Sequence, residues 1–190
     1  LRYLTGTAIG GVLVAGMSLM IHSYQRARML SFLDPWAQSQ DDGFQLVQSL
    51  IAIGSGGLWG NGFGLSQQKL DYLPIQDTDF IFSVFAEEFG LVGSVLLLVL
   101  IMSYATLGLL IARRSNHRVH RLIAVGATAF ITIQSLFNIG VAAGVLPTTG
   151  LPLPMFSYGG SSMVASLIQS ALLIRVARES AEAKVISLRS

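Results

Sequence analysis

Long apolar runs alternate with polar segments along this chain, and the runs are its strongest structural signal. An α-helix needs about 20 apolar residues to cross a hydrocarbon core of about 30 Å. Runs of about that length cover residues 4–22, 88–112, 122–145 and 157–177, and each predicts a transmembrane helix. We therefore expect an all-α integral membrane protein with four transmembrane helices, in which residues 1–190 form a portion of one polytopic membrane domain.

A long polar loop, residues 23–80, separates the first two apolar runs. Pro35, Trp36 and the glycine-rich sequences GSGG and NGFG mark turns and irregular backbone within this loop. Apolar residues recur near the helical period over residues 44–53 and predict a short helix there. Two settings stay open for this helix: it lies at the membrane surface, or it packs as an ordinary core helix under the loop.

Polar or flexible residues interrupt the later runs at three places. Gly90 and Gly93 predict a point where an outer helical segment gives way to the span proper. Gln134 and Asn138 lie inside the third run, and side-chain amides in lipid need partners, so this helix face is expected to point into the bundle. The uncharged loop LPTTGLPLPMFSYGGSS follows. Such proline-rich backbone is tolerated at membrane depth only where it is buried in protein or lines a cavity.

Composition and charge fix the class and the orientation. The mean hydropathy is +0.63 and 12% of the residues are charged, as in a membrane protein, and the absence of cysteine excludes disulfides and thiolate chemistry. Nine of the 12 Lys and Arg residues lie at Arg2, in residues 113–121 and in the tail after residue 174. By the positive-inside rule these segments are cytoplasmic, so the loop 23–80 and the proline-rich loop are extracytoplasmic.

Acidic residues gather where the extracytoplasmic loop meets the second apolar run. They are Asp71, Asp77, Asp79, Glu87 and Glu88. Carboxylates are costly at the edge of a membrane span, which makes them candidates for function. Simpler roles stay open: Thr78 or Asp79 can cap the start of a helix, and Glu87 or Glu88 can pair with a basic residue, hold a cation or bind a sugar.

Three long motifs occur in the order FLDPWAQSQDDGFQLVQSLIAIGSGGLWGNGFGLSQQKLDYLP, DTDFIFSVFAEEFGLVG and TGLPLPMFSYGGSS. From about Arg28 to about Gln169 the chain resembles the SEDS family of FtsW, RodA and SpoVE. SQQKLDYLP and TTGLPLPMFSYGGSS look more like the division members of the family than the elongation members. The resemblance implies a bundle of about ten membrane helices, of which this chain is the C-terminal part with the last four helices and the large extracytoplasmic loop.

The resemblance also implies an activity, partners and a catalytic residue. It implies a peptidoglycan glycosyltransferase that polymerises lipid II, the undecaprenyl-pyrophosphate-linked disaccharide peptide, at the outer face of the bacterial cytoplasmic membrane during septal wall synthesis. The implied partners are a class B penicillin-binding protein and other membrane proteins of the division machinery. The family's essential acidic residue matches Asp79, whereas Asp77 replaces the usual histidine and Ile75 the usual glutamate nearby.

Polymerisation of this kind requires a sugar 4-hydroxyl to attack an anomeric carbon and displace a lipid pyrophosphate. A base must accept the hydroxyl proton, and Asp79 is the expected catalytic base. The pyrophosphate needs positive charge, from a side chain or from a divalent cation such as magnesium or manganese; no other cofactor is expected. Lys69 is the expected cation on the outer side, while Arg26 and Arg28 either assist it or anchor the chain at the membrane interface.

Small and hydroxyl-bearing residues at the outer end of the last run complete the expected substrate-binding set. Together with Lys69, Glu87 and Glu88, this set contains Ser157, Tyr158, Gly159, Gly160 and Ser161. Glycine lets backbone approach a ligand, and free N–H groups at a helix start can hold an anion. The alternative is a tight turn in which Ser161 or Ser162 caps the helix.

Other functions are weighed against the enzyme. A lipid II flippase or transporter would use intramembrane carboxylates for passage or proton coupling, and a non-catalytic division scaffold would use only the loop. A transporter needs access from both faces, whereas the unusual polar motifs here lie on the outer side, which favours the enzyme. His22, His117 and His120 show no metal-ligand pattern, and GSGG lacks the lysine of a phosphate-binding loop.

Overall fold

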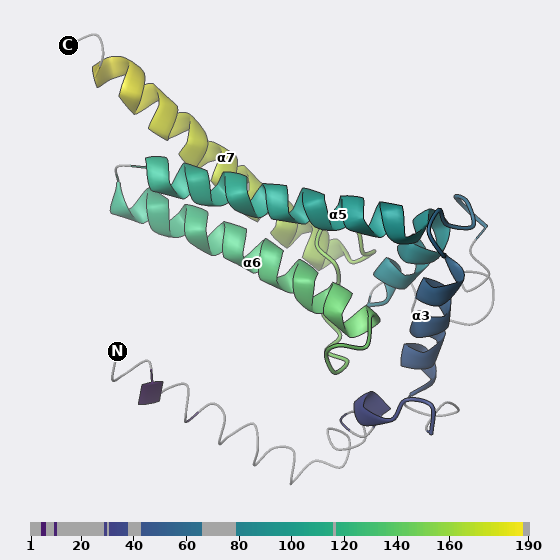
Figure 1. The fold of residues 1–190 in the computed structure, drawn as a ribbon. Helices are drawn as coiled ribbons and strands as arrows, with labels where there is room; N and C mark the ends of the chain where they lie inside the picture. Colours follow the sequence, from purple (N-terminus) through teal and green to yellow (C-terminus); the bar gives the residue numbers. More distant parts are fainter. Residues whose placement is uncertain are drawn as a thin grey trace. The chain divides into compact units, whose positions relative to one another are not determined.

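The computed structural model describes residues 5–6, 10, 29, 31–37, 43–65, 79–115 and 117–187, with side chains as far as Ala181. Within this part all regular structure is helical. Three helices are long and apolar enough to cross a membrane: α5 (Ile81–Arg114), α6 (Arg118–Ala142) and α7 (Gly160–Ser187), the last over Gly160–Ala181 (Figure 1). The prediction of an all-α membrane fold is confirmed at this level. The predicted span over residues 4–22 falls outside the described residues, apart from Thr5, Gly6 and Gly10.

The chain divides into two compact units, residues 1–47 and 48–190. In the first unit the backbone turns after Asp34, whose Oδ1 atom accepts a hydrogen bond of 3.2 Å from the N–H group of Ala37, as predicted for the segment at Pro35. The short helix α3 (Phe44–Ser55) confirms the helix expected over residues 44–53. Its location at a membrane surface stays a prediction.

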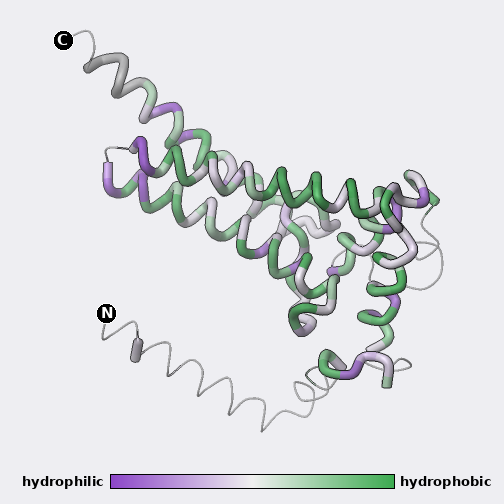
Figure 2. The backbone as a smooth tube through the Cα atoms, in the orientation of Figure 1, coloured by the Kyte–Doolittle hydropathy of each residue, from purple (hydrophilic) through white to green (hydrophobic). Residues whose placement is uncertain are grey.

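In the second unit α5 and α6 form a hairpin whose helices lie side by side (Figure 1). Small residues make close packing possible: a Cβ atom on Gly108 would overlap the side chain of Thr128. Close approach through small residues is the usual way in which helices associate in lipid. Most large aliphatic side chains of α5 are exposed instead, and Figure 2 shows its apolar character along much of its length. This exposed apolar face fits contact with lipid.

The helix α7 packs against α6 and α5, and its Leu173 and Val176 join Ala112 and Ala124 in a small buried cluster. Its ends differ from the predicted span over 157–177: the helix begins at Gly160 and continues to Ser187. The charged segment beyond residue 177 is therefore helical as far as Ser187.

The end of α6 also differs from the prediction. The helix ends at Ala142 rather than at residue 145, because Gly144 adopts a φ of 68°. The N–H groups of Val145 and Leu146 both donate to the carbonyl oxygen of Gly140, at 2.8 and 3.1 Å. This glycine-terminated end turns the chain into the proline-rich loop.

The helix α5 begins at Ile81, before the predicted start of the span near residue 88, and the predicted break between an outer segment and the span proper is confirmed at Gly90. Gly90 has φ 64° and ψ −163°, values that no helical residue adopts. A break releases backbone donors and acceptors that cost several kcal/mol if left unpaired in lipid. Their partners come from residues 57–62, the segment after α3, which we call the strap.

Four hydrogen bonds join the strap to the break. The carbonyl oxygens of Glu87 and Glu88 accept the N–H groups of Asn61 and Gly62, at 2.9 and 3.1 Å. Beyond the break the direction reverses: Leu91 and Val92 donate to the carbonyl oxygens of Gly57 and Leu58, at 2.9 and 3.2 Å. The strap thus replaces the intrahelical bonds that Gly90 removes, and it holds the outer segment of α5 at a fixed angle to the span.

Candidate functional site

Asp79 lies directly before the N-cap residue of α5, which is Phe80. No side chain caps this end of the helix, so the local role considered for Asp79, helix capping, is not observed. Phe80 is buried and belongs to the apolar core formed with Phe82 and Leu153. Because its neighbour is anchored in this core, the partly buried Asp79 has a defined place at the entrance to the helix.

The carboxylate of Asp79 faces the proline-rich loop at Gly150. A Cβ atom on Gly150 would lie 3.6 Å from Oδ2 of Asp79. Gly150 has φ +73°, a conformation that residues with a side chain rarely adopt. The loop therefore passes the carboxylate with bare backbone, and no side chain from this position covers it.

Two amides on α6 hold this loop in place. Nδ2 of Asn138 donates to the carbonyl oxygens of Asp79 and Leu151, both at 2.8 Å, and Nε2 of Gln134 donates to the carbonyl oxygen of Pro152 at 2.9 Å. The prediction that these amides face the bundle is confirmed. Their partners are backbone carbonyls of the loop and of the segment before α5. The sequence did not predict these partners. The signal for such contacts was the presence of an amide inside an apolar run.

Glu87 and Glu88 are both buried, with 2% and 6% of their surface exposed. Oε1 of Glu88 accepts a hydrogen bond of 3.1 Å from the N–H group of Gly64, just past the strap. The carboxylate of Glu88 therefore stabilises the backbone that follows the strap. The predicted ion pair with a basic residue of another helix stays a prediction.

The residues before α7 divide into a buried and an exposed group. Oγ of Ser157 is buried and accepts the N–H group of Leu153 at 2.7 Å, which closes the turn at the end of the proline-rich loop. Tyr158 is 82% exposed, and Gly160 and Ser161 are also exposed, while Gly159 is partly buried. Ser157 thus has a structural contact, and the exposed residues remain available to a ligand.

Several predicted residues fall outside the described part of the chain, and their placement stays a prediction. They are His22, Arg26, Arg28, Lys69, Asp71, Asp77 and Thr78. Among the residues that the structure does describe, no group of three or more His, Cys, Asp or Glu side chains comes together as a metal site. These residues by themselves do not fit a bound divalent cation.

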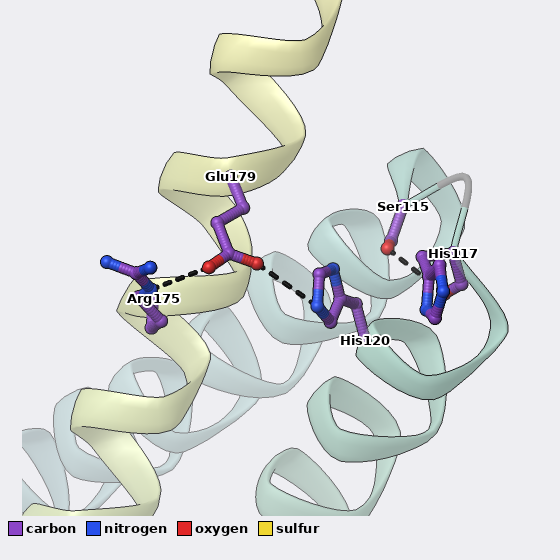
Figure 3. Close-up of polar contacts among 5 residues, drawn as sticks. All are labelled: Ser115, His117, His120, Arg175 and Glu179. Carbon is purple, nitrogen blue, oxygen red and sulfur yellow. Dashed lines mark hydrogen bonds and ion pairs between the residues drawn. The ribbon is translucent and has the colours of Figure 1, made fainter.

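A second polar cluster lies at the other end of the hairpin and links α6 to α7 (Figure 3). Nε2 of His120 lies 3.1 Å from Oε2 of Glu179, and Nε of Arg175 lies 2.7 Å from Oε1 of the same carboxylate. The ring of His117 lies 5.0 Å from that of His120, measured between centroids. These side chains pair with one another near the cytoplasmic end predicted from charge, away from Asp79.

This chain is similar in sequence to a family of known proteins. The family described as "Cell cycle protein", FTSW_RODA_SPOVE, matches residues 1–182. The chain belongs to this family. It is 62% identical to a probable peptidoglycan glycosyltransferase FtsW of Synechocystis sp., over 98% of this chain and 47% of that protein. It is 54% identical to a putative peptidoglycan glycosyltransferase FtsW of Mesostigma viride, over 93% of this chain and 43% of that protein. The chain thus spans about half the length of the curated relatives that it matches.

Two solved structures share the fold. One, described as "Structural coordination of polymerization and crosslinking by a peptidoglycan synthase complex", aligns with a TM-score of 0.71 at 32% identity, over 95% of this chain and 50% of that one. The other is the rod shape determining protein RodA of Thermus thermophilus, with a TM-score of 0.54 at 40% identity, over 70% of this chain and 40% of that one. The expected family is therefore confirmed by sequence and by fold.

Proposed function

We propose that the protein containing this chain is a peptidoglycan glycosyltransferase that polymerises lipid II at the outer face of the cytoplasmic membrane. Relatives that are 62% and 54% identical carry the name peptidoglycan glycosyltransferase FtsW, which supports this activity and a role in septal wall synthesis. The chain spans about half the length of those relatives, so the activity is proposed for the complete protein.

The observation that carries the proposal is the position of Asp79. Its side chain makes no helix cap, is partly buried, and faces bare backbone at Gly150. A carboxylate held at a membrane edge without a capping role is suited to act as a general base. Asp79 is the proposed catalytic base.

In the proposed reaction the oxygen of the sugar 4-hydroxyl forms a bond to the anomeric carbon of the donor. The hydroxyl proton passes to the Asp79 carboxylate. The bond between the anomeric carbon and the lipid pyrophosphate breaks, and its electron pair leaves with the pyrophosphate. Lys69 is the proposed partner of that departing charge, since opposite charge stabilises the transition state.

Substrate binding is assigned to the exposed residues before α7. Tyr158, Gly160 and Ser161 offer a ring, bare backbone and a hydroxyl to a sugar. Glu87 and Glu88 are buried, with the Glu88 carboxylate accepting the N–H group of Gly64, and they remain proposed substrate-binding residues. A divalent cation at the pyrophosphate remains a proposal for the complete protein.

The proposed partners are lipid II, a class B penicillin-binding protein and other membrane proteins of the division machinery, and the proposed location is the division septum. One matched structure is described as a peptidoglycan synthase complex that coordinates polymerization and crosslinking. That likeness supports a partner that performs crosslinking.

The test compares two Asp→Asn variants of the complete protein, purified with its penicillin-binding partner. Asp79→Asn keeps the size of the side chain and removes the base, and we expect glycan strands from lipid II to disappear. Asp34→Asn is the matched control, because its exposed side-chain oxygen only accepts the N–H group of Ala37, which an amide oxygen can also do.

Folding and partner binding are measured for both variants by thermal unfolding and co-purification. Loss of polymer in Asp79→Asn alone, with both measurements unchanged, supports the enzyme. Undiminished polymer in Asp79→Asn would rule out Asp79 as the base and reopen the transporter interpretation.

A further inference from the structure

Asn138 lies on α6, next to the loop that faces Asp79, and its side chain ends in an amide. Only 1% of its surface is exposed. Both of its hydrogen-bond partners are backbone carbonyl oxygens, which can only accept. The nitrogen of the amide must therefore point at them, so the orientation of the group follows from chemistry. Both donors of the amide are used, one for each carbonyl.

The two carbonyls belong to segments that are far apart in the sequence. Asp79 is separated from Asn138 by 59 positions, and Leu151 by 13. One side chain thus fixes the main chain of Asp79 to the main chain next to Gly150, the residue that its carboxylate faces. Asn138 sets the distance between the two sides of the candidate site.

The contribution of Asn138 to the stability of the fold does not by itself explain why an amide occupies this position. Within the described part of the chain, Oδ1 of Asn138 is buried without a hydrogen-bond partner. An unpaired buried acceptor costs about 1–3 kcal/mol, which offsets much of what the two donated bonds contribute. An apolar side chain of similar volume would avoid that cost, yet it could not hold the two carbonyls together.

We propose that Asn138 is a positioning residue, which places the Asp79 carboxylate for proton transfer by tying its main chain to the proline-rich loop. The proposal rests on the proposed function, because it assigns Asn138 a role only through Asp79. Misplacing a reacting group by about 1 Å can lower the rate about 100-fold. Asn138 itself touches neither sugar in this scheme.

The experiment uses the complete protein with its penicillin-binding partner and compares three variants on one helix. Asn138→Leu and Asn138→Ser both remove the bridge, and the smaller serine serves if leucine prevents folding. Ser135→Ala is the matched control, since Ser135 is also buried, one turn away, but its hydroxyl bonds only within α6, to Ile131 at 2.8 Å.

We expect the Asn138 variants to lose at least tenfold in kcat, with KM for lipid II within twofold of wild type and Ser135→Ala at the wild-type rate. A loss of folded protein is recognised separately, by thermal unfolding and co-purification.

Two results would overturn the inference. One is a folded, partner-bound Asn138 variant with kcat within twofold of wild type, or with KM for lipid II changed as much as kcat. The other is failure of both variants to fold, which would make Asn138 a structural residue. The proposed function is judged separately: if Asp79→Asn is inactive while the Asn138 variants are fully active, only the positioning role fails.

Discussion

A Cβ atom on Gly90 would overlap the amide nitrogen of Gly60, because the strap touches the backbone of α5 where that helix breaks. The same atom would lie 2.7 Å from the carbonyl oxygen of Leu58. Both glycines have positive φ, 80° at Gly60 and 64° at Gly90. The strap and the broken helix therefore fit together only through bare backbone, and this contact sets the angle at which the outer segment of α5 carries Asp79.

Gly90→Ala should lower the stability of the folded protein. This backbone conformation alone costs about 1–3 kcal/mol for a residue with a side chain, and displacement of the strap adds to that. Thermal unfolding in detergent measures the effect. Gly126→Ala is the control, because this exposed helical glycine of α6 has nothing within 4 Å of an added Cβ atom, and it should be neutral or slightly stabilising. Equal unfolding temperatures for the two variants would show that the strap contact is not rigid.

Gly108→Ala should weaken the packing of α5 on α6. Its new methyl group would overlap the Thr128 side chain, whose hydroxyl bonds within its own helix to Ala124 at 2.7 Å. Adding Thr128→Ala removes two of the overlapping atoms and should recover part of the lost unfolding temperature. If the second change gives no recovery, the two helices are not held at this distance by Gly108.

Ser49→Ala should destabilise the attachment of α3. Oγ of Ser49 donates to the carbonyl oxygen of Ala142 at 2.6 Å, and because its single proton is used there, Ser83 must donate to Ser49. Both serines are fully buried. Losing these bonds should cost about 1–3 kcal/mol. Ser55→Ala, on the exposed end of the same helix, should change the unfolding free energy little, and a similar loss in both variants would contradict this account.

Glu179→Gln should have a small effect. The side chains of His120 and Glu179 are 35% and 30% exposed, so solvent screens the pair, and such contacts contribute about 0–1 kcal/mol. Lipid II polymerisation by the variant, in the complete protein, should match wild type. A large loss of activity would instead give the polar cluster of Figure 3 a part in function.

The spans could be predicted because lipid exposure demands long apolar runs, and α5, α6 and α7 follow those runs. The ends could be predicted less well. The helix α7 continues beyond the apolar run, where Arg175 and Glu179 form an i,i+4 pair at 2.7 Å that favours helix outside lipid. The start of α5 at Ile81 lies in a segment whose apolar character begins before the span itself.

The contacts that build the site could be predicted only in part. The amides Gln134 and Asn138 had to face the protein, but nothing in their spacing named the carbonyls of Asp79 and Leu151 as partners. The glycines of the strap indicated irregular backbone, yet their fit against Gly90 depends on two segments about thirty residues apart meeting in space. Asp79 could be chosen because the family motif marks it, and the structure removes helix capping as a competing explanation.

The most direct test of the central claim is the rate at which the complete Asp79→Asn protein, bound to its penicillin-binding partner, polymerises saturating lipid II. Removing a general base typically costs about 10²–10⁴ in rate, so we expect kcat to fall at least 100-fold while the variant stays folded and partner-bound. A kcat within twofold of wild type would contradict the assignment of Asp79 as the base.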